Sequence, residues 1–173
     1  TRITISESAR RIVRTDSYHA IAFSASKLSS PAYVEVEVTD NQRSWSGHLE
    51  FGLTSERRRV NNSNLSDLGQ DIFYFKPSQA KGYRRGGSTS ELSGGSGAAG
   101  AALPIPGDHI SPDLRLGLLW DAGTLTLITR RRQDGYRPKI FGTMPGVTFS
   151  GDQAYVVMNL YGQTSGVRVM PRP

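Results

Sequence analysis

The 173-residue sequence predicts an all-β domain, an antiparallel β-sandwich of about ten short strands. Two observations favour this fold class. Apolar residues alternate with polar ones, which is the period that places successive side chains on opposite faces of a strand. Gly, Pro, Asn, Asp and Ser cluster between the alternating stretches, where tight turns need them. No stretch sustains the period of an amphipathic helix.

Strand patterns cover most of the chain. In AYVEVEV, residues 32–38, small apolar side chains alternate with Tyr and Glu. We expect the core face to carry Ala32, Val34, Val36 and Val38, and the solvent face Tyr33, Glu35 and Glu37. Residues 155–160, YVVMNL, are apolar at nearly every position, which predicts a central strand buried on both faces. Further strands are predicted, in chain order, at residues 2–6, 18–24, 48–54, 71–75, 114–120 and 123–129.

The length predicts a single domain over residues 1–173, because a chain of this size can bury roughly two thirds of its unfolded surface in one core. Residues 86–102 are nearly all Gly, Ala and Ser, so we expect a flexible insertion between strands. The chain has no cysteine and therefore no disulfide, thiolate zinc site or cysteine nucleophile. Together with the lack of a long apolar run, this predicts a cytoplasmic protein, membrane-peripheral if its basic surface meets lipid.

Catalytic and cofactor motifs are not supported. GSGAAG, residues 95–100, has the glycine spacing of a dinucleotide fingerprint, but it lies in low-complexity sequence and does not join a strand to a helix. The three histidines are far apart and have no spacing typical of metal ligands on one element. The sequence therefore predicts a non-enzyme with no cofactor and no metal.

Three glutamates leave a glycoside hydrolase open as an alternative. Glu35 and Glu37 share a strand face, and Glu50 would lie beside them if residues 40–44, DNQRS, formed a hairpin turn. The simpler interpretation is a polar outer sheet face whose carboxylates are balanced by arginines.

The charge is basic, with 21 Lys and Arg against 15 Asp and Glu. Arginine runs could meet phosphate on anionic lipid, such as phosphoinositide, or on nucleic acid, and they could equally form a solvated rim that protects sheet edges. Nucleic acid is the less favoured ligand because the interleaved aromatic residues of single-strand binders are missing. The candidate anion-binding residues are Arg57, Arg58, Arg59, Arg130, Arg131 and Arg132.

Two segments carry a family resemblance. WSGHLEFGLT, residues 45–54, follows strands ending in HAIAFSASKL, and YVVMNLYGQTSGV closes the chain at residues 155–167. In this order and at this separation they resemble the neuralized homology repeat (NHR) of the Neuralized family. Asn159 stands where that family usually has aspartate. The resemblance covers roughly two thirds of the chain and leaves residues 56–110 unaligned. LGLLWDAGTLTL, residues 116–127, is similar to the related SPRY domain, the nearest competitor.

The resemblance implies a SPRY-like or jelly-roll-like β-sandwich and a non-catalytic recognition domain that binds a protein or peptide ligand. Relatives of this kind deliver substrates to ubiquitylation machinery in other segments, recognise the Notch ligand Delta, and carry basic surfaces linked to phosphoinositides. This chain cannot itself form a RING, since RING zinc needs cysteines.

Candidate partner contacts follow from position in the predicted strands. Trp45 stands at a loop before its strand, where a large aromatic residue can anchor a partner. Tyr161 and Gln163 lie in the turn after the buried strand, and a further group flanks another strand start. That group comprises Arg14, Tyr18 and His19. Each of these side chains could instead serve packing or turn structure.

Overall fold

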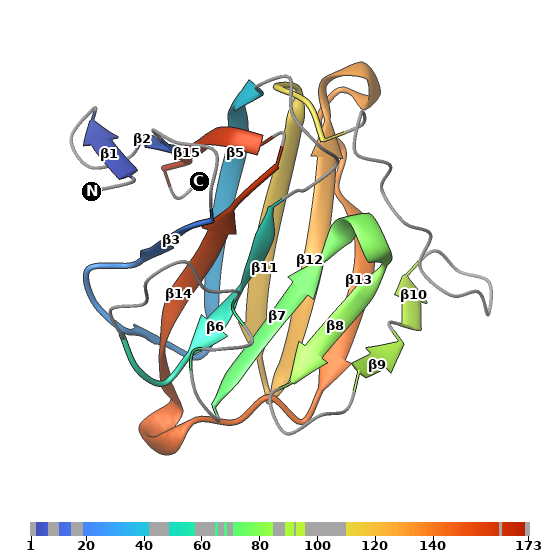
Figure 1. Ribbon diagram of the computed structural model, residues 1–173. Helices are drawn as coiled ribbons and strands as arrows, with labels where there is room; N and C mark the ends of the chain where they lie inside the picture. Colours follow the sequence, from blue (N-terminus) through green and yellow to red (C-terminus); the bar gives the residue numbers. More distant parts are fainter. Residues whose placement is uncertain are drawn as a thin grey trace.

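The computed structural model describes residues 3–6, 11–14, 19–41, 49–57, 65, 68, 71–84, 89–91, 93–95, 110–162 and 164–171. Two antiparallel sheets pack face to face, which confirms the predicted β-sandwich (Figure 1). The described residues form fifteen strands, more than the about ten predicted from alternation. Several of them are too short to show a repeating pattern: β4 has two residues, and β9 and β10 have three each.

The larger sheet has eight strands, and all of its neighbours run antiparallel. In spatial order these are β1 (Ile3–Ser6), β2 (Arg11–Arg14), β15 (Thr164–Val169), β5 (Ala32–Asn41), β11 (Leu114–Asp121), β12 (Thr124–Arg131), β13 (Lys139–Pro145) and β10 (Ser93–Gly95).

The smaller sheet has seven strands, again antiparallel. Its main order is β3 (Ala20–Phe23), β14 (Gln153–Leu160), β6 (Glu50–Thr54), β7 (Ile72–Lys76), β8 (Lys81–Arg84) and β9 (Thr89–Glu91), and β4 (Leu28–Ser29) pairs with β14. Short 3₁₀ helices are η2 (Pro77–Gln79), η4 (Arg132–Asp134) and η5 (Ser150–Asp152).

The main core lies between the two sheets. Val36 and Val38 of β5 are fully buried there, as the alternation of residues 32–38 predicts. Trp120 of β11 meets the Phe149 ring edge to face, with ring centroids 5.4 Å apart, and its Nε1 donates to the Val147 carbonyl at 3.2 Å. The indole is therefore buried without leaving its one polar hydrogen unpaired.

A second apolar cluster covers the outer face of the seven-stranded sheet. Val157 of β14 packs there with Ile72 and Tyr74 of β7 and with Leu65 and Leu68 from the connection before β7. The alternate residues of β14 face the main core. Strand β14 is thus buried on both faces, which confirms the prediction made from YVVMNL.

Residues 32–38 and 48–54 do not form the hairpin that would place Glu50 beside Glu35 and Glu37. Strand β5 pairs with β11 and β15, whereas β6 pairs with β14 and β7 in the opposite sheet. Both strands bury apolar residues in the same core from opposite sides, so their alternation looks the same in the sequence. Glu50 consequently lies in a different sheet from Glu35 and Glu37.

The predicted Gly/Ala/Ser-rich insertion at residues 86–102 contains β9 and β10, and its other residues lie outside the described part of the chain. Its flexibility stays a prediction. None of the helices among the described residues is long and apolar enough to cross a membrane.

Candidate functional site

A polar cluster lies at one end of the outer face of the seven-stranded sheet. Because the strands are antiparallel, the start of β3 and of β6 lies beside the end of β14 and of β7 (Figure 1). We call this group the end cluster. It comprises His19, Glu50, Lys76, Asn159 and Tyr161. Beside it, Arg14 of β2 in the eight-stranded sheet donates to the Gly162 carbonyl.

Asn159 is the centre of the end cluster and is fully buried. Its Nδ2 donates to Glu50 Oε2 at 2.9 Å and lies 2.9 Å from Nδ1 of His19. With the amide in this orientation, His19 Nδ1 is the acceptor of this contact. The other amide atom, Oδ1, is buried and has no hydrogen-bond partner among the described residues. An unpaired buried carbonyl is costly, so it is a place where an added donor would stabilise the protein.

Glu50 is the buried charge of the cluster, with 1% of its surface exposed. Its Oε1 lies 3.3 Å from Nζ of Lys76, which supplies the opposite charge beside this buried carboxylate. The same ammonium lies over the ring of Tyr161, 5.4 Å from its centroid. The His19 ring stacks on the same Tyr161 ring, with the two ring centroids 4.8 Å apart and an angle of 17° between the planes.

Two of the six predicted partner contacts, His19 and Tyr161, meet in the end cluster, and a third, Arg14, lies beside it. His19 is half-buried, Tyr161 is 4% exposed, and Arg14 is 1% exposed and donates to the Gly162 carbonyl. The buried Tyr161 shapes the cluster from inside, and Arg14 holds the turn that follows it. The other three, Tyr18, Trp45 and Gln163, lie outside the described residues.

Sequence reasoning missed Glu50, Lys76 and Asn159 as members of the cluster. Glu50 was expected to face solvent, but it is buried, and Leu65 and Leu68 pack on the same outer face of the sheet. One signal could have found the cluster. A polar residue inside a strand that is apolar on both faces needs a polar partner, and Asn159 in YVVMNL is such a residue.

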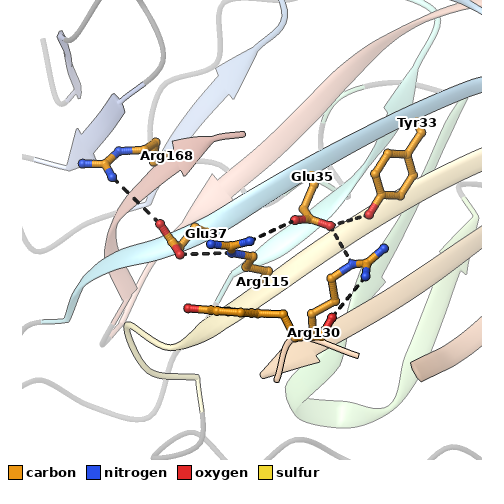
Figure 2. Close-up of polar contacts among 7 residues, drawn as sticks. Tyr33, Glu35, Glu37, Arg115, Arg130 and Arg168 are labelled. Carbon is orange, nitrogen blue, oxygen red and sulfur yellow. Dashed lines mark hydrogen bonds and ion pairs between the residues drawn. The ribbon is translucent and has the colours of Figure 1, made fainter. Parts of the chain in front are cut away.

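The outer face of the eight-stranded sheet carries a separate network of charges (Figure 2). Glu35 accepts from the Tyr33 hydroxyl and pairs with Nε of Arg130 at 2.9 Å. Glu37 pairs with Nε of Arg115 at 3.1 Å. Burial, and then the hydrogen bond to Glu35, raise the pKa of Tyr33 above its usual range. This is the arginine-balanced outer face that the sequence favours.

These pairs remove the basis for a glycoside hydrolase. Glu35 and Glu37 are already held by arginines, and Glu50 lies in the other sheet. No described group of three or more His, Asp or Glu side chains could hold a metal ion.

The described members of the predicted anion-binding set lie in two places, Arg57 beside β14 and Arg130, Arg131 and Arg132 at the end of β12. Arg130 pairs with Glu35, Arg131 lies 4.0 Å from Asp113, and Arg132 is exposed in η4. Arg57 lies over the ring of Tyr155 at 5.0 Å. Arg58 and Arg59 are outside the described residues. Binding of anionic lipid or nucleic acid by these runs stays a prediction.

Comparison with known proteins gives a consistent family. A family model described as Neuralized matches residues 1–171. The crystal structure of the Drosophila melanogaster Neuralized NHR1 domain is similar, with a TM-score of 0.65 and 16% identity over 99% of this chain and 92% of that chain. The solution structure of the Drosophila melanogaster Neuralized NHR domain gives a TM-score of 0.62 and 18% identity, covering 98% of this chain and 85% of that one.

The SPRY domain of human HERC1 has the same fold, with a TM-score of 0.61 and 10% identity over 98% of this chain and 92% of that chain. A comparison with curated protein sequences gave no match. At these identities the structural likeness shows the fold, while the sequence match to the family model shows the family.

Proposed function

This chain belongs to the Neuralized family, whose homology repeat is a protein-interaction module, and from that premise we propose that it is a non-catalytic domain that binds a peptide segment of a partner protein. The fold suits that role, because a rigid sandwich holds binding groups at the strand ends and in the loops that join them.

The end cluster is the best-supported place for this contact. The observation that carries the proposal is the buried Oδ1 of Asn159, which has no partner among the described residues although its neighbours Glu50 and His19 fix the amide. Because Asn159 is fully buried, it marks the polar end of β14, and a bound peptide would contact the half-buried His19 and Lys76 beside it.

The other three candidate contacts are close in sequence to residues at this end of the sheet. Tyr18 precedes His19 in the chain, Gln163 follows the Gly162 that Arg14 holds, and Trp45 precedes the start of β6. Tyrosine and tryptophan are common anchors in protein interfaces because they combine a large apolar surface with one polar group. In this proposal they contact the partner, while Arg14 and Tyr161 hold the site in shape.

The resemblance supports a more specific role. The bound partner would be a substrate or adaptor that machinery in another segment or protein ubiquitylates, with Notch ligands of the Delta type as one substrate class. A cytoplasmic location, membrane-peripheral where the substrate is a membrane protein, belongs to the same proposal.

Quantitative affinity capture tests the proposal. Wild-type domain, Trp45→Ala and His19→Ala would be immobilised, and captured proteins would be confirmed as synthetic peptides by fluorescence anisotropy. Tyr155→Ala is the matched control, since Tyr155 is a half-buried aromatic residue on the same strand as Asn159 but toward its other end. We expect both site variants to lose the same peptides and the control to keep them. Folded site variants that retain every partner would place the contact elsewhere.

A further inference from the structure

A row of charged residues crosses the outer face of the eight-stranded sheet at right angles to the strands. The strand register places each member opposite the next, from β2 through β15, β5 and β11 to β12. We call it the arginine row. Its members are, in this order, Arg11, Arg168, Glu37, Arg115 and Arg130.

The arginine row contains two pairs of neighbouring arginines that carry the same charge. Arg11 lies opposite Arg168, and Arg115 lies opposite Arg130. Like charges directly across from each other destabilise a sheet. Three carboxylates beside them reduce the repulsion: Glu35, Glu37 and Asp40. The exposed Arg132, which lines a groove together with Arg11, Arg168 and Glu37, adds a further cation, so arginines outnumber carboxylates on this part of the face.

An open groove of about 420 Å³ lies beside the part of the row formed by Arg11, Arg168 and Glu37. The volume is in the range of small-ligand sites. Its polar lining combines three arginines with two acceptors and a tyrosine. These residues are Arg11, Arg132, Arg168, Glu37, Thr39 and Tyr136.

The walls of the groove are held in place by neighbours. Asp40 accepts from Thr39 at 2.7 Å and from Arg11 at 3.0 Å, and these two hydrogen bonds hold its pKa below the usual range. The Arg115 guanidinium lies over the Tyr136 ring, 3.9 Å from the centroid. Arg132 differs from the other groove arginines, because within the described part of the chain it has no ion pair and is exposed. Its guanidinium group is therefore available to a ligand.

We propose that this groove binds an acidic segment of a protein, with an Asp or Glu side chain of that segment held by Arg132 and Arg168. A carboxylate matches the planar guanidinium fork. Glu37 and the Thr39 hydroxyl oxygen can accept N–H groups from the peptide backbone. A polyphosphate chain is the poorer ligand, because it has acceptor oxygens only and no N–H group to donate to Glu37 or Thr39. The site lies on the opposite sheet from the end cluster and does not rest on the function proposed for that cluster.

Fluorescence anisotropy at low ionic strength tests the groove, with a fluorescein-labelled peptide of alternating Glu and Gly as the probe. The same peptide with Gln in place of Glu is the neutral comparison. We expect saturable binding of the acidic peptide, a loss of about tenfold or more in Arg132→Glu, and a smaller loss in Arg168→Gln. Arg137→Glu makes the same charge change at an exposed arginine outside the groove lining, and we expect a change of less than about twofold.

Three outcomes would overturn the proposal. The first is no binding of the acidic peptide to the wild-type domain. The second is an equal loss in Arg132→Glu and Arg137→Glu, which would indicate attraction by net charge alone. The third is tighter binding of a labelled oligothymidylate, or of phosphatidylserine vesicles, through the same two arginines. Partner capture by the end cluster should be unchanged in Arg132→Glu, so failure of one site is distinguishable from failure of the other.

Discussion

Replacing Lys76 by methionine asks whether the buried carboxylate of the end cluster depends on one cation. The Glu50 side chain is 2% exposed and that of Lys76 is 23% exposed, with their charged atoms 3.3 Å apart. Removing one partner of a fully buried pair costs about 3–5 kcal/mol. Lys76 is partly solvated, and Glu50 keeps its hydrogen bond from Asn159, so we expect Lys76→Met to lower the free energy of unfolding by about 2–3 kcal/mol.

The double variant separates charge from packing. In Glu50→Gln with Lys76→Met the buried group is neutral, and its amide oxygen can still accept from Asn159. We therefore expect a loss of only about 1 kcal/mol. The difference between this value and the sum of the single variants is the coupling energy of the pair.

Urea unfolding followed by fluorescence measures these values. A loss of 2–3 kcal/mol should shift the midpoint by about 1 M with an unchanged slope. Lys81→Met is the control, because Lys81 lies opposite Lys76 on β8 and is exposed. If Lys76→Met stays within about 0.5 kcal/mol of the wild type, or if the two substitutions are additive, the ammonium does not hold the buried charge and the reasoning fails.

Three further results are expected on the eight-stranded sheet. Gly117→Ala should lower stability by about 1–3 kcal/mol in thermal unfolding, because its methyl group would collide with the Tyr33 ring, and the loss should shrink when Tyr33 is also Ala. The depressed pKa of Asp40 implies stability that is present above its unfolded pKa and lost as pH falls through the folded one. Asp40→Asn should therefore differ from the wild type by less than about 1 kcal/mol at neutral pH, and the gap should close in acid urea titrations. The raised pKa of Tyr33 implies stability that is present below its unfolded pKa and lost as pH rises through the folded one, so the ultraviolet difference between wild type and Tyr33→Phe should show a tyrosine ionising above about pH 10. A difference spectrum complete at or below that pH would contradict the assignment.

Alternation in the sequence predicted which residues are buried but not which sheet they join. The valines of β5 and both faces of β14 were predicted correctly, since burial depends on the pattern within one strand. The sequence left the pairing of β5 with β6 open, because a short segment between two amphipathic strands can either turn back within a sheet or cross to the other sheet, as it does here. Both choices bury the same apolar side chains, and the pattern does not distinguish them.

Only part of the candidate site was predicted, because the rest depends on which strands pair with each other. His19 and Tyr161 were singled out because they flank strand ends, and the fold brings their rings into contact. Glu50 and Lys76 meet only through the pairing of β6 with β7, and Asn159 joins them from the far end of the chain. Contacts of that sequence separation leave no local periodic signal.

The ion pairs of the arginine row are linked one to the next, and this has a consequence for how the surface can change in evolution. Glu37 serves Arg115 and Arg168, and Arg115 also lies near Glu35, which in turn holds Arg130. Losing Glu35 would remove the ion pair of Arg130, which faces Arg115 across the sheet, and losing Glu37 would remove one ion pair from each of Arg115 and Arg168. Tolerated substitutions on this face are expected to be epistatic, so that the replacement of a glutamate is accepted mainly in a background that has already lost a neighbouring arginine.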